Sequence, residues 1–190
     1  MNITTGKPTK PVGWWEGCEI LGGRDEVAGG TWLACSRGGR LAFLSNVLEL
    51  DTDPEAKSRG DLPVLFLKST KTPKEFAQEL AKEAHRYNGF NLVLADIPSK
   101  TMIYLSNRPK GEAILVQEVS PGIHVLSNAK LDSPWHKGRY GTRSSAAVTV
   151  RQNGALSFYE NYLDNDHTWK EHTVNYQIQK LSWLKEIWNP

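Results

Sequence analysis

The amino-acid sequence predicts an α+β domain in which stacked antiparallel sheets are flanked by helices. Short runs rich in β-branched, aromatic and aliphatic residues recur along most of the chain and are separated by turn residues, as in sheets built from hairpins. One segment, residues 73–87, carries strong helix signals. The 190 residues, of which 39% are hydrophobic, suffice for a single domain over residues 1–190 with a sizeable core.

The first expected element is a hairpin. TWLACS (31–36) and RLAFLSN (40–46) are β-compatible runs. Arg37-Gly38-Gly39 between them suits a turn that needs positive φ.

Two helices are expected next. In LPVLFLKS (62–69) the helix and strand patterns compete, and we favour a helix. The second helix is expected over residues 73–87, and Thr72 and Glu75 form a Thr-x-x-Glu capping box at its start. One face of this second helix is apolar and should pack on a sheet; it carries Phe76, Leu80, Ala84 and Tyr87.

The rest of the chain is mostly strand-like, and the sequence leaves the strand order open. An antiparallel meander is expected over residues 91–96, 101–107, 112–119 and 123–128. A second hairpin, with an Asn-Gly turn at 153–154, and one further strand are expected over residues 145–151, 155–161 and 172–179. Residues 181–188 place Leu181, Leu184 and Trp188 on one helical face.

Composition and charge exclude several functional classes. The chain has 23 Lys and Arg against 21 Asp and Glu, a formal net charge of +2 without long charge runs, so no nucleic-acid partner is expected. No segment approaches the roughly 20 apolar residues of a membrane span. The first residues lack a signal-peptide or transit pattern, which predicts a cytoplasmic protein. The five histidines have no partners at metal-ligand spacing, so no metal is expected, although haem needs only one axial histidine.

The two cysteines and the Trp14-Trp15 pair each allow two interpretations. Cys35 is either a nucleophile or a core residue, and its position within an expected strand favours packing. Cys18 is expected to be a surface thiol. Trp14-Trp15 either lines a hydrophobic groove or anchors the N-terminal segment on the sheet, and we favour the anchor.

One segment reads as an interrupted helix. Ser133-Pro134 is a helix start signal, yet Gly138 follows within about one turn and a strand is expected shortly after it.

Several segments together resemble the transport-and-Golgi-organisation family, also called the NRDE family. The resemblance extends from Pro8 to about Ile178, with residues 1–7 unrelated. The matching blocks are PTKPVGWW (8–15), ILGGRDEVAGGTWLACSRGGRLAFLSN (20–46), SRGDL (58–62), HRYNGFNLVLAD (85–96), HVLSNAKLDSPW (124–135) and YGTRSSAAV (140–148).

Two departures from the family pattern imply a shortened form of its domain. Family members begin with a Met-Cys strand leading to an Asn-Arg-Asp-Glu motif, which residues 1–7 replace here. They also carry a helical insert between the SPW and GTRSS blocks, which would explain the interrupted helix at Ser133. A shortened chain carries the alternative that it does not fold stably, because a lost strand leaves an unpaired sheet edge.

The family in turn is similar to the N-terminal-nucleophile hydrolases, which implies an αββα fold, here incomplete. By motif, Asn46 and Asn128 correspond to oxyanion donors and Arg143 to a late site arginine, while the nucleophile lies in the missing part, so no catalytic residue is assigned. The residues alone equally allow that both asparagines are turn residues and that Arg143 forms a surface ion pair.

The resemblance implies a role in Golgi organisation, protein secretion and lipid or haem homeostasis, with links to mitochondria. We expect a cleft between two sheets, lined by Asn46, Asn128 and Arg143, that binds an acidic, partly apolar small molecule, of haem or acyl type, as cargo rather than cofactor. Golgi-associated and mitochondrial locations are alternatives to the cytoplasm. The alternative function is an N-terminal-nucleophile amide hydrolase whose nucleophile this chain lacks.

Overall fold

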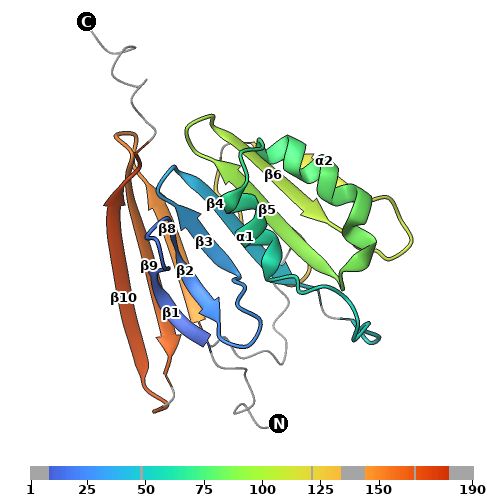
Figure 1. Ribbon diagram of the computed structural model, residues 1–190, viewed down its shortest axis with the longest axis horizontal. Coiled ribbons are helices and arrows are strands. Elements are labelled where there is room, and N and C mark those ends of the chain that lie inside the picture. Colours follow the sequence, from blue (N-terminus) through green and yellow to red (C-terminus); the bar gives the residue numbers. More distant parts are fainter. Residues whose placement is uncertain (1–8, 48, 121, 134–143, 165, 180–190) are drawn as a thin grey trace, which may run out of the picture.

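The computed structural model describes residues 9–47, 49–120, 122–133, 144–164 and 166–179. They form mostly antiparallel sheets with two short helices, the mixed α and β content that the sequence predicts. A seven-stranded sheet carries both helices on one face and a three-stranded sheet on the other, over its β1–β4 side (Figure 1).

The strands of the larger sheet follow one another in chain order, and each neighbouring pair is antiparallel. They are β1 (Thr9–Trp14), β2 (Ile20–Asp25), β3 (Leu33–Ser36), β4 (Arg40–Asn46), β5 (Phe90–Asp96), β6 (Thr101–Ser106) and β7 (Leu115–Glu118). The smaller sheet, in the order β10-β9-β8, contains β8 (Ser144–Val150), β9 (Ala155–Leu163) and β10 (Trp169–Gln177). The two predicted hairpins and the meander from β4 to β7 are therefore confirmed.

The expected strand over residues 123–128 is wrong. This segment makes a single isolated bridge, between Leu126 and Leu131, and Ile123 is 98% exposed. Leu126 and Leu131 instead pack on the face of the larger sheet, against Val93 and Tyr104. The segment is thus held by side-chain burial on a face rather than by pairing at an edge.

The β1–β2 hairpin, in contrast, is not apparent from the sequence. Pro11 and the glycines of residues 9–25 obscure a strand pattern, and the register shifts between Lys10 and Gly13. The interrupted helix after Ser133 and the apolar face of residues 181–188 fall on residues 134–143 and 180–190, outside the described residues.

Both predicted helices are present. α1 (Asp61–Lys68) resolves the competition in residues 62–69 in favour of helix. α2 (Pro73–Glu83) ends earlier than predicted, and a 3₁₀ turn, Ala84–Arg86, follows it. The expected face of α2 packs on the sheet, since Leu80 and Tyr87 belong to the core between helices and sheet. The predicted capping box of α2 is present: the Glu75 N–H donates to Thr72 Oγ1 (3.2 Å), and the Thr72 N–H donates to Glu75 Oε2 (2.9 Å).

Replacing Thr72 by alanine should lower the free energy of unfolding by about 1 kcal/mol, because the first turn of α2 loses its side-chain acceptor. Urea denaturation monitored by circular dichroism measures this difference. Thr70→Ala is the matched control, since Thr70 is an exposed residue of the same loop. Equal stabilities of the two variants would show that the capping box contributes nothing.

The second core lies between the two sheets. It contains Val12, Leu21, Leu156, Phe158 and Cys35. Cys35 is fully buried, as expected for packing, and burial raises the pKa of its thiol to about 11. Cys18 is exposed, also as expected.

The two residues of the Trp14-Trp15 pair divide the two proposed roles, anchoring the N-terminal segment and lining a groove, between them. Trp14 packs edge-on against Tyr176 of the smaller sheet, with ring centroids 5.0 Å apart. Trp15 instead faces the helix side, where its Nε1 donates to the carbonyl oxygen of Gly22 (3.1 Å).

Candidate functional site

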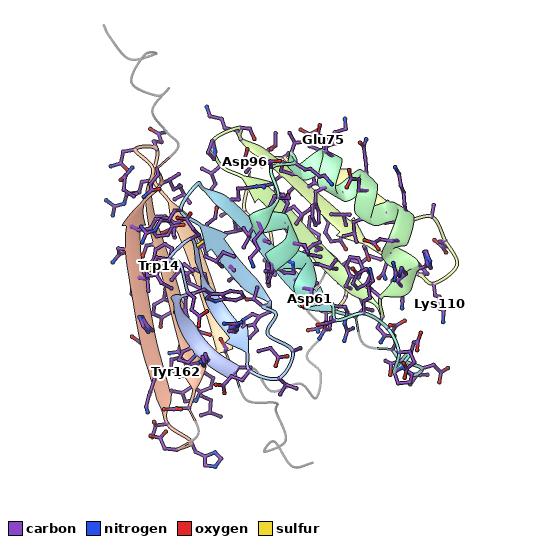
Figure 2. The ribbon with its side chains drawn as sticks, viewed as in Figure 1. Trp14, Asp61, Glu75, Asp96, Lys110 and Tyr162 are labelled. Atoms are coloured by element: carbon purple, nitrogen blue, oxygen red, sulfur yellow. The ribbon has the colours of Figure 1, made fainter. Side chains whose placement is uncertain are left out.

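One end of the larger sheet brings together most of the segments on which the family resemblance rests. In the antiparallel register, the end of β4 lies beside the start of β5 and the end of β6, with Asn46 opposite Phe90 and Asn91 opposite Ser106. We call this region the strand-end cluster; it contains residues 44–46, 88–91, 106–108 and 127–129. Figure 2 shows Asp61 and Lys110 at this end of the sheet, and Asp96 and Glu75 at the other end.

Two of the three predicted ligand residues meet in the strand-end cluster. The side-chain amide of Asn128 donates to the main-chain carbonyl of Asn46 (2.7 Å), and Ser45 Oγ donates to the carbonyl of Ser127 (2.7 Å). Both asparagines are exposed. Arg143 lies outside the described residues. The roles assigned to the three side chains stay predictions.

Asn91 holds this arrangement in place, and the sequence analysis missed it. Its side chain is fully buried and donates to the carbonyls of Ser127 (3.3 Å) and Ala129 (2.9 Å). Its amide oxygen accepts a hydrogen bond from Tyr104 Oη (2.8 Å). A polar residue inside the apolar run FNLVLAD was the available signal, because a buried amide must be hydrogen-bonded.

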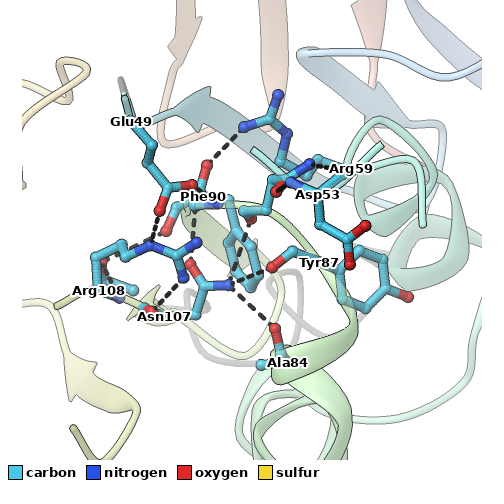
Figure 3. A network of polar contacts seen from close by, with 11 residues as sticks. Glu49, Asp53, Arg59, Ala84, Tyr87, Phe90, Asn107 and Arg108 are labelled. Atoms are coloured by element: carbon cyan, nitrogen blue, oxygen red, sulfur yellow. Dashed lines mark hydrogen bonds and ion pairs between the residues drawn. The ribbon is translucent and has the colours of Figure 1, made fainter. Parts of the chain in front are cut away.

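A network of charged and polar groups closes the cluster on its helix side (Figure 3). Arg108 donates to the carboxylate of Glu49, which also accepts from the Gly89 N–H (2.5 Å). Arg59, from the SRGDL block, donates to the carbonyl of Gly89 (2.8 Å). The Glu49 and Arg108 side chains are only 14% and 16% exposed. The hydrogen bond from Arg108 is the largest effect lowering the pKa of Glu49 below its ordinary value.

This pKa shift predicts an acid-sensitive contribution to stability. Because the Glu49 pKa is lower in the folded state, its contribution is complete above the ordinary value near 4.5 and is lost as pH falls below it. Glu49→Gln should lower the free energy of unfolding by about 1 kcal/mol at pH 7 and flatten its decline between about pH 5 and pH 3. Urea titrations at several pH values measure both; parallel pH profiles for the two proteins would contradict the assignment.

Among the described residues, neither cysteine belongs to the strand-end cluster. Cys35 is buried between the sheets, and Cys18 lies in an exposed turn. The His124 ring is held at both nitrogens, by Asp132 (2.7 Å) and by the Ser120 carbonyl (2.8 Å). These contacts raise the pKa of His124, with the Asp132 hydrogen bond as the main cause.

A second site, the α1 groove, runs beside α1 along the helix-facing side of β2. It has a volume of about 890 Å³, and its walls are the β1–β2 turn, α1 and the loop between the two helices. Trp15, Ile20, Val64 and Leu67 provide apolar surface. The charged side chains that line it are Glu16, Glu19, Arg24, Arg40, Lys68, Lys71 and Asp96.

Arg40, Lys71 and Asp96 of the groove already have polar partners; Ser99 Oγ donates to the Asp96 carboxylate (2.6 Å). Arg40 donates to the carbonyls of Ser69 and Lys71, and Lys71 pairs with Glu79. Within the described ranges, Arg24 and Lys68 form no ion pair with a carboxylate. Arg24 lies over the Trp15 ring, 4.9 Å from its centroid, and its Nε donates to the carbonyl of Gly29 (3.4 Å). The groove therefore offers Arg24 and Lys68 beside apolar surface, and its exposed carboxylates, Glu16 and Glu19, likewise form no ion pair within the described residues.

The described part of the chain contains no group of three or more His, Cys, Asp or Glu side chains placed to hold a metal ion. None of its helices has the length and apolar character needed to cross a bilayer.

Comparison with known proteins identifies the family. The family model for transport and Golgi organisation 2 matches residues 4–139. The chain belongs to the transport and Golgi organisation 2 family. This family match covers the SRGDL and HRYNGF blocks and the residues of both candidate sites up to Ser133, whereas the sequence resemblance described above extends to about Ile178.

Curated relatives within the transport and Golgi organisation 2 family agree. The chain is 37% identical over 157 residues to the mouse transport and Golgi organization 2 homolog, covering 79% of this chain and 55% of that protein. It is 37% identical over 142 residues to the human transport and Golgi organization protein 2 homolog, covering 71% and 50%. The chain thus spans about half the length of the curated relatives that it matches.

Proposed function

We propose that this chain acts in Golgi organisation and the secretory pathway by binding an acidic, partly apolar small molecule in the α1 groove. Family membership supports the cellular role, since its relatives are named for transport and Golgi organization. The observation that carries the molecular part is the juxtaposition of Trp15, Leu67 and two cations without carboxylate partners in one groove. A role in lipid or haem homeostasis, and a cytoplasmic, mitochondrial or Golgi-associated location, belong to the same proposal.

The groove suits such a ligand in size and chemistry. Its volume of about 890 Å³ lies within the range of small-molecule sites. Apolar walls take up the body of the ligand, and a carboxylate or phosphate gains charge-assisted hydrogen bonds from Arg24 and Lys68. Haem and long-chain acyl compounds both combine an apolar body with anionic groups, so both satisfy this description.

Titration of the purified chain tests the proposal. Haem and a long-chain acyl-coenzyme A should each be assayed by quenching of tryptophan fluorescence, because Trp15 lines the groove. We expect saturable binding of at least one probe, weakened by salt because it depends on solvent-accessible cations. A linear, unsaturable response to both probes would overturn the proposal.

The fold and the strand-end cluster support a second candidate, an N-terminal-nucleophile-like domain. Stacked antiparallel sheets with helices on one outer face agree with three of the four layers of an αββα architecture. In support, the Asn128 amide lies beside Asn46 at the end of β4, and these are the two residues that the family resemblance assigns as oxyanion donors. Since neither cysteine suits a nucleophile, we expect no turnover of a panel of acyl amides; turnover that Asn128→Ala abolishes would establish a hydrolase.

A further inference from the structure

The two sheets have four edge strands, and three of them carry features that block pairing with another chain. β1 contains Pro11 and a register irregularity, and β7 has only four residues. β10 carries Lys170, Glu171 and His172. Bulges, short length, proline and charge are the devices by which natural sheets protect their edges.

β8 has none of these protections. Its seven residues, SSAAVTV, include no charge, no proline and no glycine, and the ladder to β9 is continuous from Ser144 to Val150. In the described part of the chain, β8 pairs on one side only, with β9. Among the described residues, its outer row of main-chain groups thus has no strand partner and can pair with a further strand.

The face of β8 that looks toward the larger sheet is also incompletely covered. Val148 contacts the core between the sheets, whereas Ala146 is exposed and Val150 is 38% exposed. These three residues lie in the same rows as Glu160, Phe158 and Leu156 of β9, which are at least 97% buried. A strand added beside β8 would extend this apolar surface and shield it.

We propose that β8 pairs with β8 of a second copy of this chain, joining the two three-stranded sheets into one six-stranded antiparallel sheet. The sequence of β8 is complementary to itself in this arrangement. An antiparallel register centred on Ala147 sets Ser145 opposite Thr149 and Ala146 opposite Val148, so that small or β-branched residues meet and no charges do. The interface is isologous, as in the commonest closed oligomers.

Sedimentation equilibrium of the full chain tests the pairing. The wild type should have twice its 21.3 kDa chain mass, and Ala147→Lys, which sets two like charges opposite each other, should raise the dissociation constant about tenfold. Thr173→Lys is the matched control, because Ala147, Tyr159 and Thr173 form one row across the sheet and Thr173 lies on the opposite edge. A monomeric wild type, or equal dissociation constants for the two lysine variants, would overturn the proposal.

Cysteine cross-linking decides the matter independently of the effect of lysine on folding. In a Cys18→Ser background, which removes the exposed thiol, Ala147→Cys should form a covalent dimer on mild oxidation, and Thr173→Cys should stay monomeric. Equal cross-linking of the two variants would contradict pairing through β8. The remaining alternative is that β8 pairs with a strand of a different protein, in which case the purified chain would be monomeric.

Discussion

Replacing Asn107 by alanine is expected to lower the free energy of unfolding by about 3 kcal/mol. Asn107 is buried beyond the end of β6, and its amide oxygen accepts a hydrogen bond from the Phe90 N–H (2.8 Å). Its amide nitrogen donates to the carbonyls of Ala84 (3.0 Å), the first residue of the 3₁₀ turn, and Tyr87 (3.2 Å), which follows the turn (Figure 3). Without this side chain, the Phe90 N–H and the Tyr87 carbonyl lose these partners inside the protein, whereas the Ala84 carbonyl keeps the Tyr87 N–H (3.3 Å).

Asn88→Ala provides the comparison for this loss. Asn88 makes two hydrogen bonds with the main chain of Asp53, both 2.8 Å long and both near the surface, so water can replace them. We expect a loss of about 1 kcal/mol for Asn88→Ala in the same urea denaturation experiment. Equal losses for the two variants would show that Asn107 does not connect the helix layer to the sheet.

Reversing the two available charges of the α1 groove should have the largest effect on binding. In the double variant Arg24→Glu, Lys68→Glu, two attractive contacts with an anionic ligand become repulsive, and we expect the affinity for the probe that binds to fall at least about a hundredfold. Lys68 is exposed, whereas Arg24 is partly buried over the Trp15 ring, so the thermal unfolding temperature of the double variant is measured beside the affinity to confirm that the fold is retained. Tryptophan fluorescence titration measures the affinity.

A control variant that reverses two exposed cations outside the groove separates a local effect on ligand binding from an effect of the protein's net charge. Arg151 and Lys130 are exposed and do not line the groove, so Arg151→Glu, Lys130→Glu changes the total charge equally. This control should retain nearly the wild-type affinity at physiological salt. A comparable loss of affinity in the control would mean that the groove is not where the ligand binds.

Local signals were sufficient to predict much of the fold. The capping box at Thr72 and the Asn-Gly turn before Ala155 depend on neighbours in the sequence, and both appear in the structure. β1 was missed because Pro11 and the bulge break its alternation, and its pairing depends on β2. Residues 123–128 were assigned to a strand because the same apolar residues can pack on a sheet face or pair at an edge, and only the tertiary structure distinguishes these cases.

In the candidate sites, too, some features follow from local sequence and others depend on the tertiary structure. Asn46 ends β4, as its short motif predicts, whereas Asn128 lies outside any strand, and its hydrogen bond to Asn46 brings the two together across 82 residues of sequence. The α1 groove combines the β1–β2 hairpin with α1 and the loop after it. Arg24 and Lys68 become neighbours of Trp15 and Leu67 only once the sheet order is known, and therefore no spacing in the sequence could have indicated them.

Photo-cross-linking with a long-chain acyl probe that carries a photoreactive group tests most directly whether the α1 groove is the ligand site. The labelled chain is digested and the modified peptides are identified by mass spectrometry, with excess unlabelled acyl compound as competitor. We predict competitor-sensitive labelling of peptides that contain Trp15 and residues 64–68, which line the groove. Labelling confined to residues 44–46 and 124–133 would contradict the account and place the ligand at the strand-end cluster instead.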